Sequence, residues 1–500
     1  MRAKRLFHIH EDNLRVGPLS EEQERSQTES QSQTLRADDD YDEHEHDDED
    51  VEREADDEEH DRDDDASESS DEEDPIDTTV QQDMEKLQHT FPHFRNEYRL
   101  IKRIGEGTFS TVYKAEDIRY DHYVNSWDID ADDGQWTPPP LRSSSGSHLN
   151  HTTRPPRRKP KFVAIKKIYV TSSPARILNE LELLHDLRAS PSVCPLITAF
   201  RESDQVLLIL PYFRHQDFRK YYPRMNVYDT RVYLRALFTA LAAVHARGII
   251  HRDIKPTNFL YDPDKKRGVL VDFGLAEREG TDTKPCLCHE DRQVRKHRLQ
   301  QAVAFNSLHT AGQQPGFPKQ DTRPSRRANR AGTRGFRAPE VLFKCTEQTA
   351  KIDVWSAGVI LLTVLCKRFP FFNSADDVEA MIEIATIFGS KRMRLAGQLH
   401  GCMFDATIPT ISSQGFSFEK IMLWSTCRSD GGRDGSASAL SAEEKEAVEF
   451  LARCMDLDPT RRISAEEALR HPFLMVETED EAETEGGMDN ALDAEEVMML

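Results

Sequence analysis

The sequence reads His251-Arg252-Asp253-Ile254-Lys255-Pro256-Thr257-Asn258, and Asp272-Phe273-Gly274 follows 14 residues after Asn258. If the first stretch forms a tight loop, its carboxylate, ammonium group and amide can all point into one site, which the carboxylate of Asp272 can join. Either motif alone occurs by chance as a solvated loop or turn, whereas the two in this order and spacing are specific. The residues expected to form this polar site are Asp253, Lys255, Asn258 and Asp272.

This pattern resembles the catalytic segment of protein kinases, which transfer the γ-phosphate of ATP to a hydroxyl group. In that chemistry Asp253 would accept the proton of the hydroxyl, and Lys255 would offset charge on the γ-phosphate. Asn258 and Asp272 would hold Mg²⁺. The sequence therefore predicts an α+β, bilobal protein kinase fold. This fold would have a small β-rich N-lobe and a larger helical C-lobe, and ATP would bind between the two lobes.

A glycine-rich stretch from Ile104 to Tyr113 precedes this segment, with Ser110 where a third glycine usually stands. Its β-rich flanks predict a hairpin whose glycines let the backbone approach the ATP phosphates without Cβ clashes. Val163-Ala164-Ile165-Lys166 follows as a third strand, with Lys166 directed at the α and β phosphates. In the kinase fold Leu210 would be the gatekeeper and Asp217 a ribose contact. The residues expected to contact the nucleotide are Ile104, Gly105, Gly107, Val112, Ala164, Lys166, Leu210, Tyr212, Asp217, Asn258 and Asp272.

Lys166 requires a carboxylate partner on a helix. Apolar residues recur with a helical period between residues 177 and 187, which predicts that helix. Glu180 is the expected partner and Glu182 the alternative, and the one that is not used would lie on a solvated helix face.

The segment Gly332–Glu340 is expected to seat the residues around the acceptor hydroxyl, with Thr333, Arg334 and Arg337 as substrate-binding residues. Planar guanidinium groups suit a carboxylate or phosphate that follows the acceptor. Further arginines just upstream can widen this basic field: Arg323, Arg326, Arg327 and Arg330. Lys255 and Thr333 indicate serine or threonine as the acceptor.

Two further residues are expected to have structural roles in a kinase fold. Arg462 should pair with a buried Glu340, and Asp353 should hold the backbone of the catalytic loop.

Charge is distributed very unevenly along the chain. Residues 38–74 carry 25 acidic and 2 basic residues, a net charge of −23 that equals the formal charge of the whole chain. Such a block cannot bury enough apolar surface to offset chain entropy, so disorder is expected here. It is either a solvating tail or a decoy or phosphoacceptor segment, since Ser67, Ser69 and Ser70 directly precede four acidic residues.

The chain is expected to be intracellular and reduced. Its eight cysteines are widely scattered and do not form a disulfide framework. No signal peptide is visible at the N-terminus, and the longest apolar run, Val354–Cys366, is too short to span a bilayer. Arg154–Lys161 contains five basic residues among prolines, which is either a nuclear address or a solvated loop.

The predicted organisation has three parts. These are a disordered acidic region (1–93), a kinase domain (94–473, with N-lobe 98–210 and C-lobe 214–473) and an acidic tail (474–500). Three segments interrupt the kinase pattern and are predicted to be inserts, at about 117–161, 277–331 and 390–441, and the first of them is rich in Pro, Ser and Arg. The second insert lies inside the activation segment.

That second insert contains Cys286, Cys288 and His289, with His297 nearby. Thiolate and imidazole are preferred zinc ligands, and an insert without a core of its own can be held together by a metal. The spacing fits no common zinc pattern closely, so the alternatives are a structural zinc site and neighbouring reduced side chains on a mobile loop.

The family resemblance is narrower than the kinase fold. The stretches His215–Arg219, Lys255–Tyr261, Gly335–Arg337 and Ile352–Ile360, together with a long insert in the activation segment, resemble the cell-division-cycle-seven kinases. The resemblance extends from about Phe94 to Phe473.

The resemblance implies an enzyme that is inactive alone and is switched on by a regulatory subunit. It would use ATP and Mg²⁺ to phosphorylate acidic Ser/Thr-rich tails of the replicative helicase in the nucleus, at the initiation of DNA replication. No membrane or direct nucleic-acid partner is expected. The alternatives are a constitutive acidophilic kinase of the casein-kinase-two type and, from another class, a pseudokinase scaffold.

Overall fold

The computed structural model describes residues 3–4, 9–11, 77–107, 109–125, 127–128, 160–280, 285–301, 329–428 and 439–475. The acidic stretch 38–74, most of the basic run 154–161 and most of the tail 474–500 lie outside the described residues, as do Arg323, Arg326 and Arg327. The chain forms two compact units, one of residues 1–173 with 196–212 and one of residues 174–195 with 213–500.

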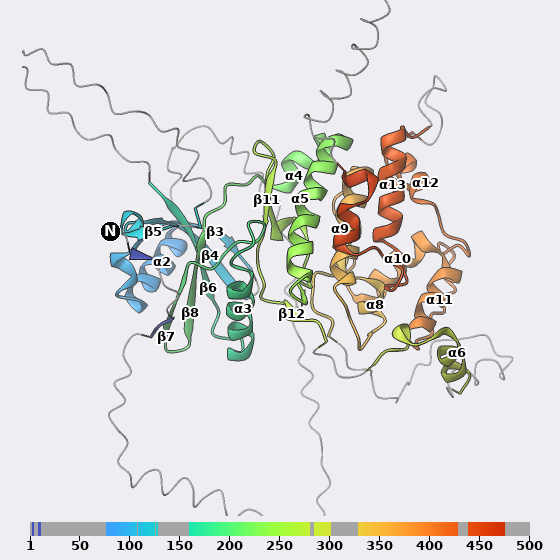
Figure 1. The fold of residues 1–500 in the computed structure, drawn as a ribbon, viewed down its shortest axis with the longest axis horizontal. Helices are drawn as coiled ribbons and strands as arrows, with labels where there is room; N and C mark the ends of the chain where they lie inside the picture. The colour runs from blue at the N-terminus through green and yellow to red at the C-terminus, as the bar shows by residue number, and fades with distance from the viewer. Residues whose placement is uncertain are drawn as a thin grey trace, which may run out of the picture. The chain divides into compact units, whose positions relative to one another are not determined.

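The first unit is built on one sheet with the strand order β2-β7-β8-β6-β4-β3 (Figure 1). All neighbours are antiparallel except β2, which runs parallel to β7. The strands are β2 (Ile9–Glu11), β3 (Tyr98–Glu106), β4 (Ser110–Asp117), β6 (Phe162–Ile168), β7 (Thr198–Glu202) and β8 (Gln205–Pro211). A separate parallel pair joins β1 (Ala3–Lys4) to β5 (Tyr123–Val124), and short 3₁₀ turns cover Phe94–Asn96 and Tyr120–His122.

The two faces of this sheet differ in burial. Along β4, buried and partly buried residues alternate strictly, as the period of two in a strand requires. Tyr113 and Ala115 of β4 join Val163, Ile165 and other residues in one apolar cluster. This face is the core of the first unit, so the opposite face of β4 and β6 is the one that can serve a ligand.

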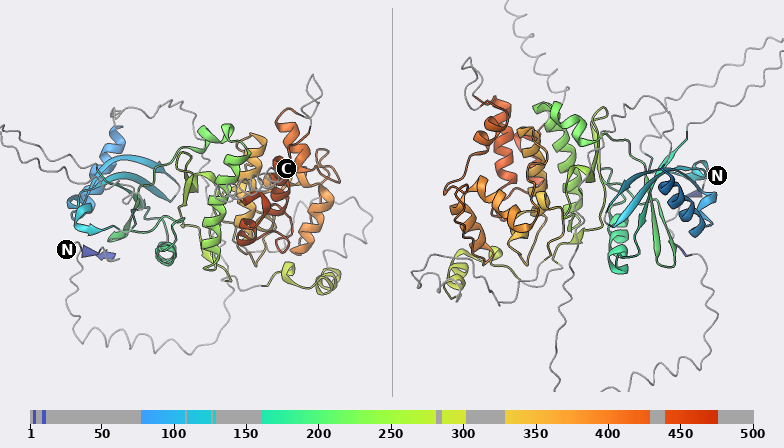
Figure 2. Two further views of the ribbon diagram at one scale, coloured as in Figure 1. Left: turned by 45° about the horizontal axis from the view of Figure 1, so that its top comes forward. Right: turned by 180° about the vertical axis from the view of Figure 1, so that it is seen from behind.

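Helix α2 (Thr78–Thr90) covers the core face, and Figure 2 shows it lying against the sheet. Val80, Met84 and Leu87 form its apolar stripe and are buried in the same cluster. Asp77 caps the helix by accepting a hydrogen bond from the backbone N–H of Thr79 at 3.1 Å. The predicted end of the disordered region at residue 93 is therefore wrong, because an apolar stripe with i, i+4, i+7 spacing starts well before it.

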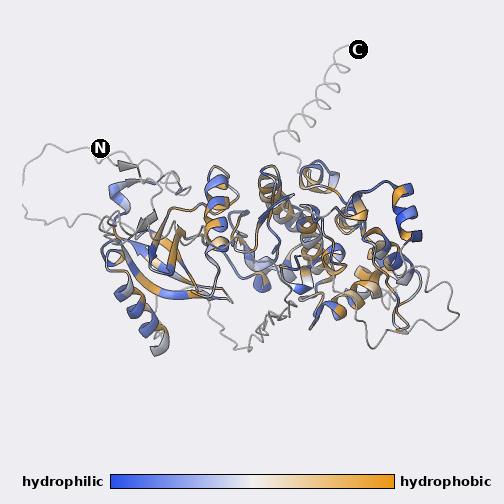
Figure 3. Ribbon diagram, turned by 90° about the horizontal axis from the view of Figure 1, so that it is seen from below, coloured by the Kyte–Doolittle hydropathy of each residue, from blue (hydrophilic) through white to orange (hydrophobic). Residues whose placement is uncertain are grey.

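The second unit is mainly helical, and Figure 3 shows helices in it with distinct hydrophobic and hydrophilic faces. Its helices of eight or more residues are α3 (Pro174–Leu187), α5 (Val227–His245), α6 (Arg292–Gln301), α9 (Lys351–Cys366), α10 (Asp377–Phe388), α11 (Ser390–Leu399), α12 (Phe418–Ser425) and α13 (Ala442–Cys454). Shorter helices and 3₁₀ turns are α4 (Phe218–Tyr221), η4 (Tyr222–Arg224), η5 (Pro256–Asn258), η6 (Leu287–His289), η7 (Arg334–Phe336), α8 (Pro339–Leu342), α14 (Ala465–Leu469) and η8 (Pro472–Leu474). Its strands are β9 (Ile249–Ile250), β10 (Phe259–Asp262), β11 (Arg267–Leu270) and β12 (Glu277–Arg278), paired as β10–β11 and β9–β12.

Two helices show why this unit is stable. Helix α5 begins with a capping box in which Asn226 and Asp229 each bond the other's backbone N–H. Every residue of α9 except Lys351 is buried, so α9 forms the centre of the unit. None of the helices among the described residues combines the length and apolar character needed to cross a lipid bilayer.

Helix α3 belongs to the second unit in this division, although the predicted N-lobe, 98–210, includes it. The amide Nδ2 of Asn179 donates to the carbonyl of Ala276 at 2.8 Å, and Val193 bridges to Leu270. Leu181, Leu184 and Leu187 are buried, as their period predicts. These contacts tie α3 to the segment that follows the catalytic loop.

The predicted inserts contain regular structure where the structure describes them. The second insert, 277–331, contains β12, η6 and α6, and the third, 390–441, contains α11 and α12. Helix α6 has no buried residue, which agrees with the strongly polar composition of that insert.

Candidate active site

The segment 251–258 forms a tight loop between β9 and β10, and Asp253 lies at its centre, 7% exposed. Its Oδ1 accepts hydrogen bonds from the backbone N–H of Thr333 at 3.0 Å and from the Thr333 hydroxyl at 2.7 Å. Its Oδ2 accepts from Nδ2 of Asn258 at 2.9 Å and lies 3.2 Å from Nζ of Lys255. Nζ of Lys255 also donates to the Thr333 hydroxyl at 2.9 Å. A carboxylate so placed can take a proton from a hydroxyl group. The ammonium group beside it can offset negative charge that develops there.

Asp353 holds the backbone of this loop through hydrogen bonds, which confirms its predicted structural role. Its carboxylate accepts from the backbone N–H of His251 at 2.8 Å and of Arg252 at 2.9 Å, and from Nε2 of His245 at 2.9 Å. Burial alone would raise the pKa of Asp353, but these hydrogen bonds and the nearby histidines hold it below its ordinary value. Asp353 is therefore held as an anion in the core.

Gly332 explains how the downstream segment reaches Asp253. Its φ is +107°, and a Cβ at this position would lie 2.4 Å from the carbonyl oxygen of Arg252. Only glycine combines this backbone conformation with so close an approach. Glycine at 332 thus brings the backbone and hydroxyl of Thr333 onto Asp253.

The predicted Mg²⁺ residues, Asn258 and Asp272, have suitable oxygen atoms. Nδ2 of Asn258 donates to both the backbone carbonyl and Oδ2 of Asp253, so its amide oxygen is the atom that can serve a hard cation. Asp272 has φ of +65°, a left-handed conformation that aspartate tolerates, and its side chain is exposed. The next residue, Phe273, is fully buried and packs edge-on against the ring of His251 at 4.8 Å. This packing anchors Asp272 beside the catalytic loop.

In the first unit, strand register gathers the predicted nucleotide residues on one face of the sheet. Val112 pairs with Lys166, and Ala164 pairs with Leu210. Residues opposite each other across a strand pair share a face, as do residues two apart along a strand. All four side chains therefore lie on the face opposite the α2-covered core.

The glycine-rich stretch forms the β3–β4 hairpin, as predicted. Gly105 pairs with Val112, and the backbone N–H of Gly107 donates to the carbonyl of Ser110 at 2.9 Å. Ile104 and Phe109 beside this turn are 39% and 43% exposed. Apolar side chains left open on this hairpin suit contact with a flat purine ring.

Burial distinguishes the two carboxylates considered for Lys166. Lys166 is buried on β6, at 8% exposure, in the first unit. On α3 of the second unit, Glu180 is buried at 5% exposure whereas Glu182 is exposed. Glu180 is thus the buried one of the two carboxylates, and its pairing with Lys166 stays a prediction.

The other two predicted nucleotide residues have local contacts of their own. Tyr212 is the last residue of the first unit. The centroid of its ring lies 4.5 Å from Nζ of Lys114. Asp217 caps α4, because its carboxylate accepts from the backbone N–H of Arg219 at 2.8 Å. A ribose contact by Asp217 stays a prediction.

Arg337, a predicted substrate residue, and Arg330, from the predicted upstream basic field, both pair with Asp377. Nη1 of Arg337 lies 2.6 Å from one oxygen of Asp377, and Nη1 of Arg330 lies 3.2 Å from the other. Arg337 is largely buried and also donates from Nε to the carbonyl of Gly332 at 2.7 Å. Arg334 lies in η7 and is half-buried. The Arg330–Arg337 pair is thus able to hold one carboxylate.

A buried ion pair supports this segment from the far side. Nη1 and Nη2 of Arg462 bind Oε1 and Oε2 of Glu340 at 2.6 and 2.9 Å, which confirms the predicted pairing. Both side chains are almost completely excluded from solvent.

The structure changes the predicted zinc ligands. Cys286 and Cys288 are buried in a cluster of possible metal ligands, but His289 and His297 are exposed and do not belong to it, so these two histidines were the wrong candidates. Cys345 and His400 complete the cluster instead, and its four ligand atoms all lie within 4.8 Å of one another. Sequence spacing could not reveal them, because Cys345 is 57 residues from Cys288 and His400 is 114 residues from Cys286. Only the fold brings them together.

The distances in this cluster fit a tetrahedral metal. Zn–S bonds of about 2.3 Å and Zn–N bonds of about 2.0–2.1 Å place two sulfurs about 3.8 Å apart, and a sulfur and a nitrogen about 3.6 Å apart. Sγ of Cys288 and Cys345 are 3.8 Å apart, and Sγ of Cys286 lies 3.6 Å from Nδ1 of His400. Hydrogen bonds from the thiols of Cys288 and Cys345 hold the pKa of Cys286 well below its ordinary value. This buried Cys₃His set can hold a zinc ion.

Comparison with known proteins identifies a kinase domain and kinase relatives. A family model described as a protein kinase domain matches residues 155–295 and 316–474. The cell cycle serine/threonine-protein kinase hsk1 of Schizosaccharomyces pombe is 50% identical over 79% of this chain and 76% of its own. The cell cycle protein kinase spo4 of the same yeast is 40% identical over 80% of this chain and 90% of its own. The human cell division cycle 7-related protein kinase is 26% identical over 79% of this chain and 92% of its own.

These matches confirm the predicted kinase fold, with its β-rich N-lobe and helical C-lobe, and a kinase domain implies ATP and Mg²⁺. They also confirm the family resemblance and the predicted enzyme class. The chain belongs to the cell-division-cycle-seven (Cdc7) family of serine/threonine protein kinases.

Proposed function

We propose that this kinase phosphorylates serine and threonine residues in acidic segments of nuclear proteins, with Asp253 as the base and Asn258 and Asp272 as the Mg²⁺ ligands. The observation that carries the proposal is the contact of Asp253 with Thr333, Lys255 and Asn258 in one cluster. Lys166 and Glu180 would form the phosphate-binding pair, and both are buried. Lys255 would neutralise charge on the transferred phosphate.

Acidic substrates are proposed because Arg330 and Arg337 share one carboxylate, that of Asp377. A carboxylate or phosphate next to the acceptor residue of a substrate can form hydrogen bonds with these guanidinium groups. Arg334 would add a third guanidinium group to the site. Charge-assisted hydrogen bonds of this kind contribute about 1.5–3 kcal/mol when partly desolvated.

The test compares kcat/KM for two matched peptides, Ser-Asp and Ser-Ala, at fixed ionic strength and in the presence of the activating nuclear extract. Arg337→Glu should reduce the Ser-Asp to Ser-Ala ratio by about 10-fold. The matched control is Arg394→Glu, because Arg394 forms an ion pair with Asp405 outside this segment. An unchanged ratio in Arg337→Glu would mean that Arg337 only anchors the segment through Gly332 and Asp377.

We infer further that a regulatory subunit activates the enzyme and that its substrates include replicative helicase subunits at the initiation of DNA replication. The support is that the chain belongs to the Cdc7 family. Its two yeast relatives hsk1 and spo4 are both named as cell cycle kinases. A helix such as α3, which carries Glu180, is an element that a bound subunit can bias.

Activation is tested by phosphate transfer to an acidic serine peptide with and without nuclear extract. The purified chain alone should be nearly inactive, and extract should restore activity to wild-type chain but not to Asp253→Asn. Full activity of the purified chain would favour the constitutive casein-kinase-two-like alternative. Inactivity of the wild type under both conditions would favour a scaffold.

We also propose that Cys286, Cys288, Cys345 and His400 bind a structural zinc ion. Their distances match the edges of a zinc tetrahedron, and their burial suits a closed structural site. Elemental analysis of the purified chain should find one zinc per molecule, and Cys345→Ser should lose most of it. Cys427→Ser, at an exposed cysteine, is the matched control. A metal-free wild type whose stability does not respond to added zinc would refute the assignment.

A further inference from the structure

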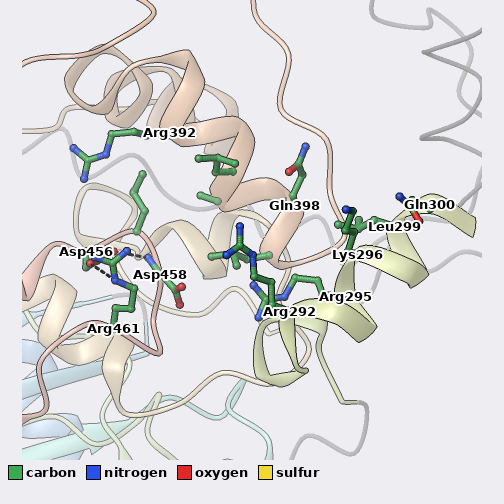
Figure 4. A pocket seen from close by; sticks show the side chains of 14 residues that line it. Arg292, Arg295, Lys296, Leu299, Gln300, Arg392, Gln398, Asp456, Asp458 and Arg461 are labelled. Atoms are coloured by element: carbon green, nitrogen blue, oxygen red, sulfur yellow. Dashed lines mark hydrogen bonds and ion pairs between the residues drawn. The ribbon is translucent and has the colours of Figure 1, made fainter.

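A basic pocket lies in the second unit, away from the catalytic loop. Its volume is about 530 Å³, and it is lined by α6, α11 and the loop 456–461. Five of the lining residues are basic, namely Arg292, Arg295, Lys296, Arg392 and Arg461, and two are acidic, Asp456 and Asp458. Figure 4 shows the basic side chains of α6 on one side and Arg392 on the other.

The two carboxylates do not neutralise the pocket. Asp458 accepts from the backbone N–H and hydroxyl of Thr460, at 3.0 and 2.7 Å. Asp456 accepts from the backbone N–H of Asp458 at 3.0 Å and lies 3.5 Å from Arg461. These carboxylates offset part of the positive charge, and five basic residues against two acidic ones leave the pocket with an excess of positive charge.

Four of the five basic residues form no ion pair with any residue that the structure describes: Arg292, Arg295, Lys296 and Arg392. Arg392 stacks over the ring of Phe388 at 4.8 Å, which positions its guanidinium group without neutralising it. A guanidinium group that is already fixed loses less conformational entropy when it binds a carboxylate than a mobile guanidinium group does.

Arg295 holds α6 in place. Its guanidinium group donates to the carbonyls of Leu287, Cys288 and Glu290, at 2.9, 3.1 and 2.9 Å. All three carbonyls belong to the turn that contains Cys286 and Cys288. The basic face of α6 is therefore attached to a rigid support, although α6 itself buries no residue.

The chain supplies a complementary ligand. Residues 38–74 contain 25 acidic and 2 basic residues, whereas the rest of the chain is balanced. The stretch ends three residues before Asp77, where a continuously described segment of the fold begins, so it is tethered to the kinase. Extended, its 37 residues reach about 120 Å, and tethering raises its effective concentration at any site within reach.

We propose that this basic pocket is a docking site for the chain's own acidic stretch, residues 38–74. The pairing is electrostatic, so it weakens as salt rises. This interaction is separate from the proposed substrate site, because none of the lining residues belongs to the Asp253 cluster.

The test is zero-length carbodiimide cross-linking of the full-length chain, which joins a carboxylate to a lysine amine only where the two are in contact. Lys296 is the one lysine among the lining residues. Mass spectrometry of the monomer band should find Lys296 joined to residues 38–74, and raising salt to 0.5 M should reduce that product. Lys391, exposed on α11 but outside the lining, is the matched control.

Variants separate pocket binding from chance proximity. Arg292→Gln combined with Arg392→Gln should reduce the Lys296 product at least about threefold, with Lys391 products unchanged. Lys296→Arg should abolish the product while keeping the charge. The proposal is overturned if Lys296 cross-links no more than Lys391, if it joins the acidic C-terminal tail instead, or if the product occurs only in dimers.

Discussion

The buried pair of Glu340 and Arg462 allows a prediction of stability that does not depend on activating the kinase. All five N–H groups of Arg462 have acceptors. Two bind the Glu340 oxygens, at 2.6 and 2.9 Å, and the others bind the backbone carbonyls of Asp456 and Lys351 at 2.7–3.0 Å. Arg462 is 1% exposed and Glu340 is 2% exposed.

Glu340→Gln keeps the shape of the side chain but removes its charge. An amide NH₂ then faces the guanidinium group, and one buried cation loses its counter-ion. Breaking a buried pair in this way costs about 3–5 kcal/mol. With a urea m-value of about 3 kcal/mol/M for a unit of this size, the midpoint of unfolding should fall by about 1 M or more.

The measurement is urea unfolding of the full chain followed by far-UV circular dichroism. Glu466→Gln is the matched control, because Glu466 forms an exposed i,i+4 pair with Arg470 that contributes at most about 0.5 kcal/mol. Replacing both buried partners, as Glu340→Leu with Arg462→Met, should recover much of the loss. A shift in Glu340→Gln no larger than in the control would refute the reasoning.

Three further predictions concern the catalytic loop. Asp253→Asn should lower phosphate transfer by about 10²-fold or more while ATP binding, measured by calorimetry, stays nearly intact; wild-type turnover would exclude Asp253 as the base. Thr333→Val should lower kcat/KM by about 10-fold, because two hydrogen bonds to charged groups are lost, whereas Thr333→Ser should stay close to wild type. The pKa of Asp353 is lowered in the folded state, so its stabilising contribution is present above its unfolded pKa, near 3.8, and is lost as pH falls through the lower folded value. Acid unfolding of Asp353→Asn, followed by circular dichroism, should therefore lack this part of the pH dependence; an identical profile would show that Asp353 is not the group responsible.

The polar residues of the catalytic site could be predicted because they lie in short local motifs. Asp253, Lys255 and Asn258 fall within six residues, and the tight loop they require follows from that spacing. The Arg462–Glu340 and Asp353 contacts are long-range in sequence, but the kinase pattern as a whole implies them. Local motifs therefore gave the site once the fold class was known.

Other features could not be predicted in the same way. The Cys₃His cluster draws on residues from the activation-segment insert, from the turn after α8 and from the end of α11, and no local pattern links these positions. Helix α2 was missed for a different reason. The high charge of residues 38–74 dominated the composition of the whole N-terminal region and obscured a three-residue apolar stripe in α2.

The cysteine cluster and the catalytic loop are joined by a short series of contacts. The backbone N–H of Cys286 donates to Oε2 of Glu347 at 2.8 Å, and Nε2 of Gln348 donates to the carbonyl of Cys345 at 3.0 Å. Oε1 of the same Gln348 accepts from Nη1 of Arg252, the residue before Asp253, at 2.5 Å. A zinc ion that fixes Cys345 would therefore also fix Gln348 and, through it, one side of the catalytic loop. With zinc bound, the insert that interrupts the activation segment would support the catalytic loop through these contacts.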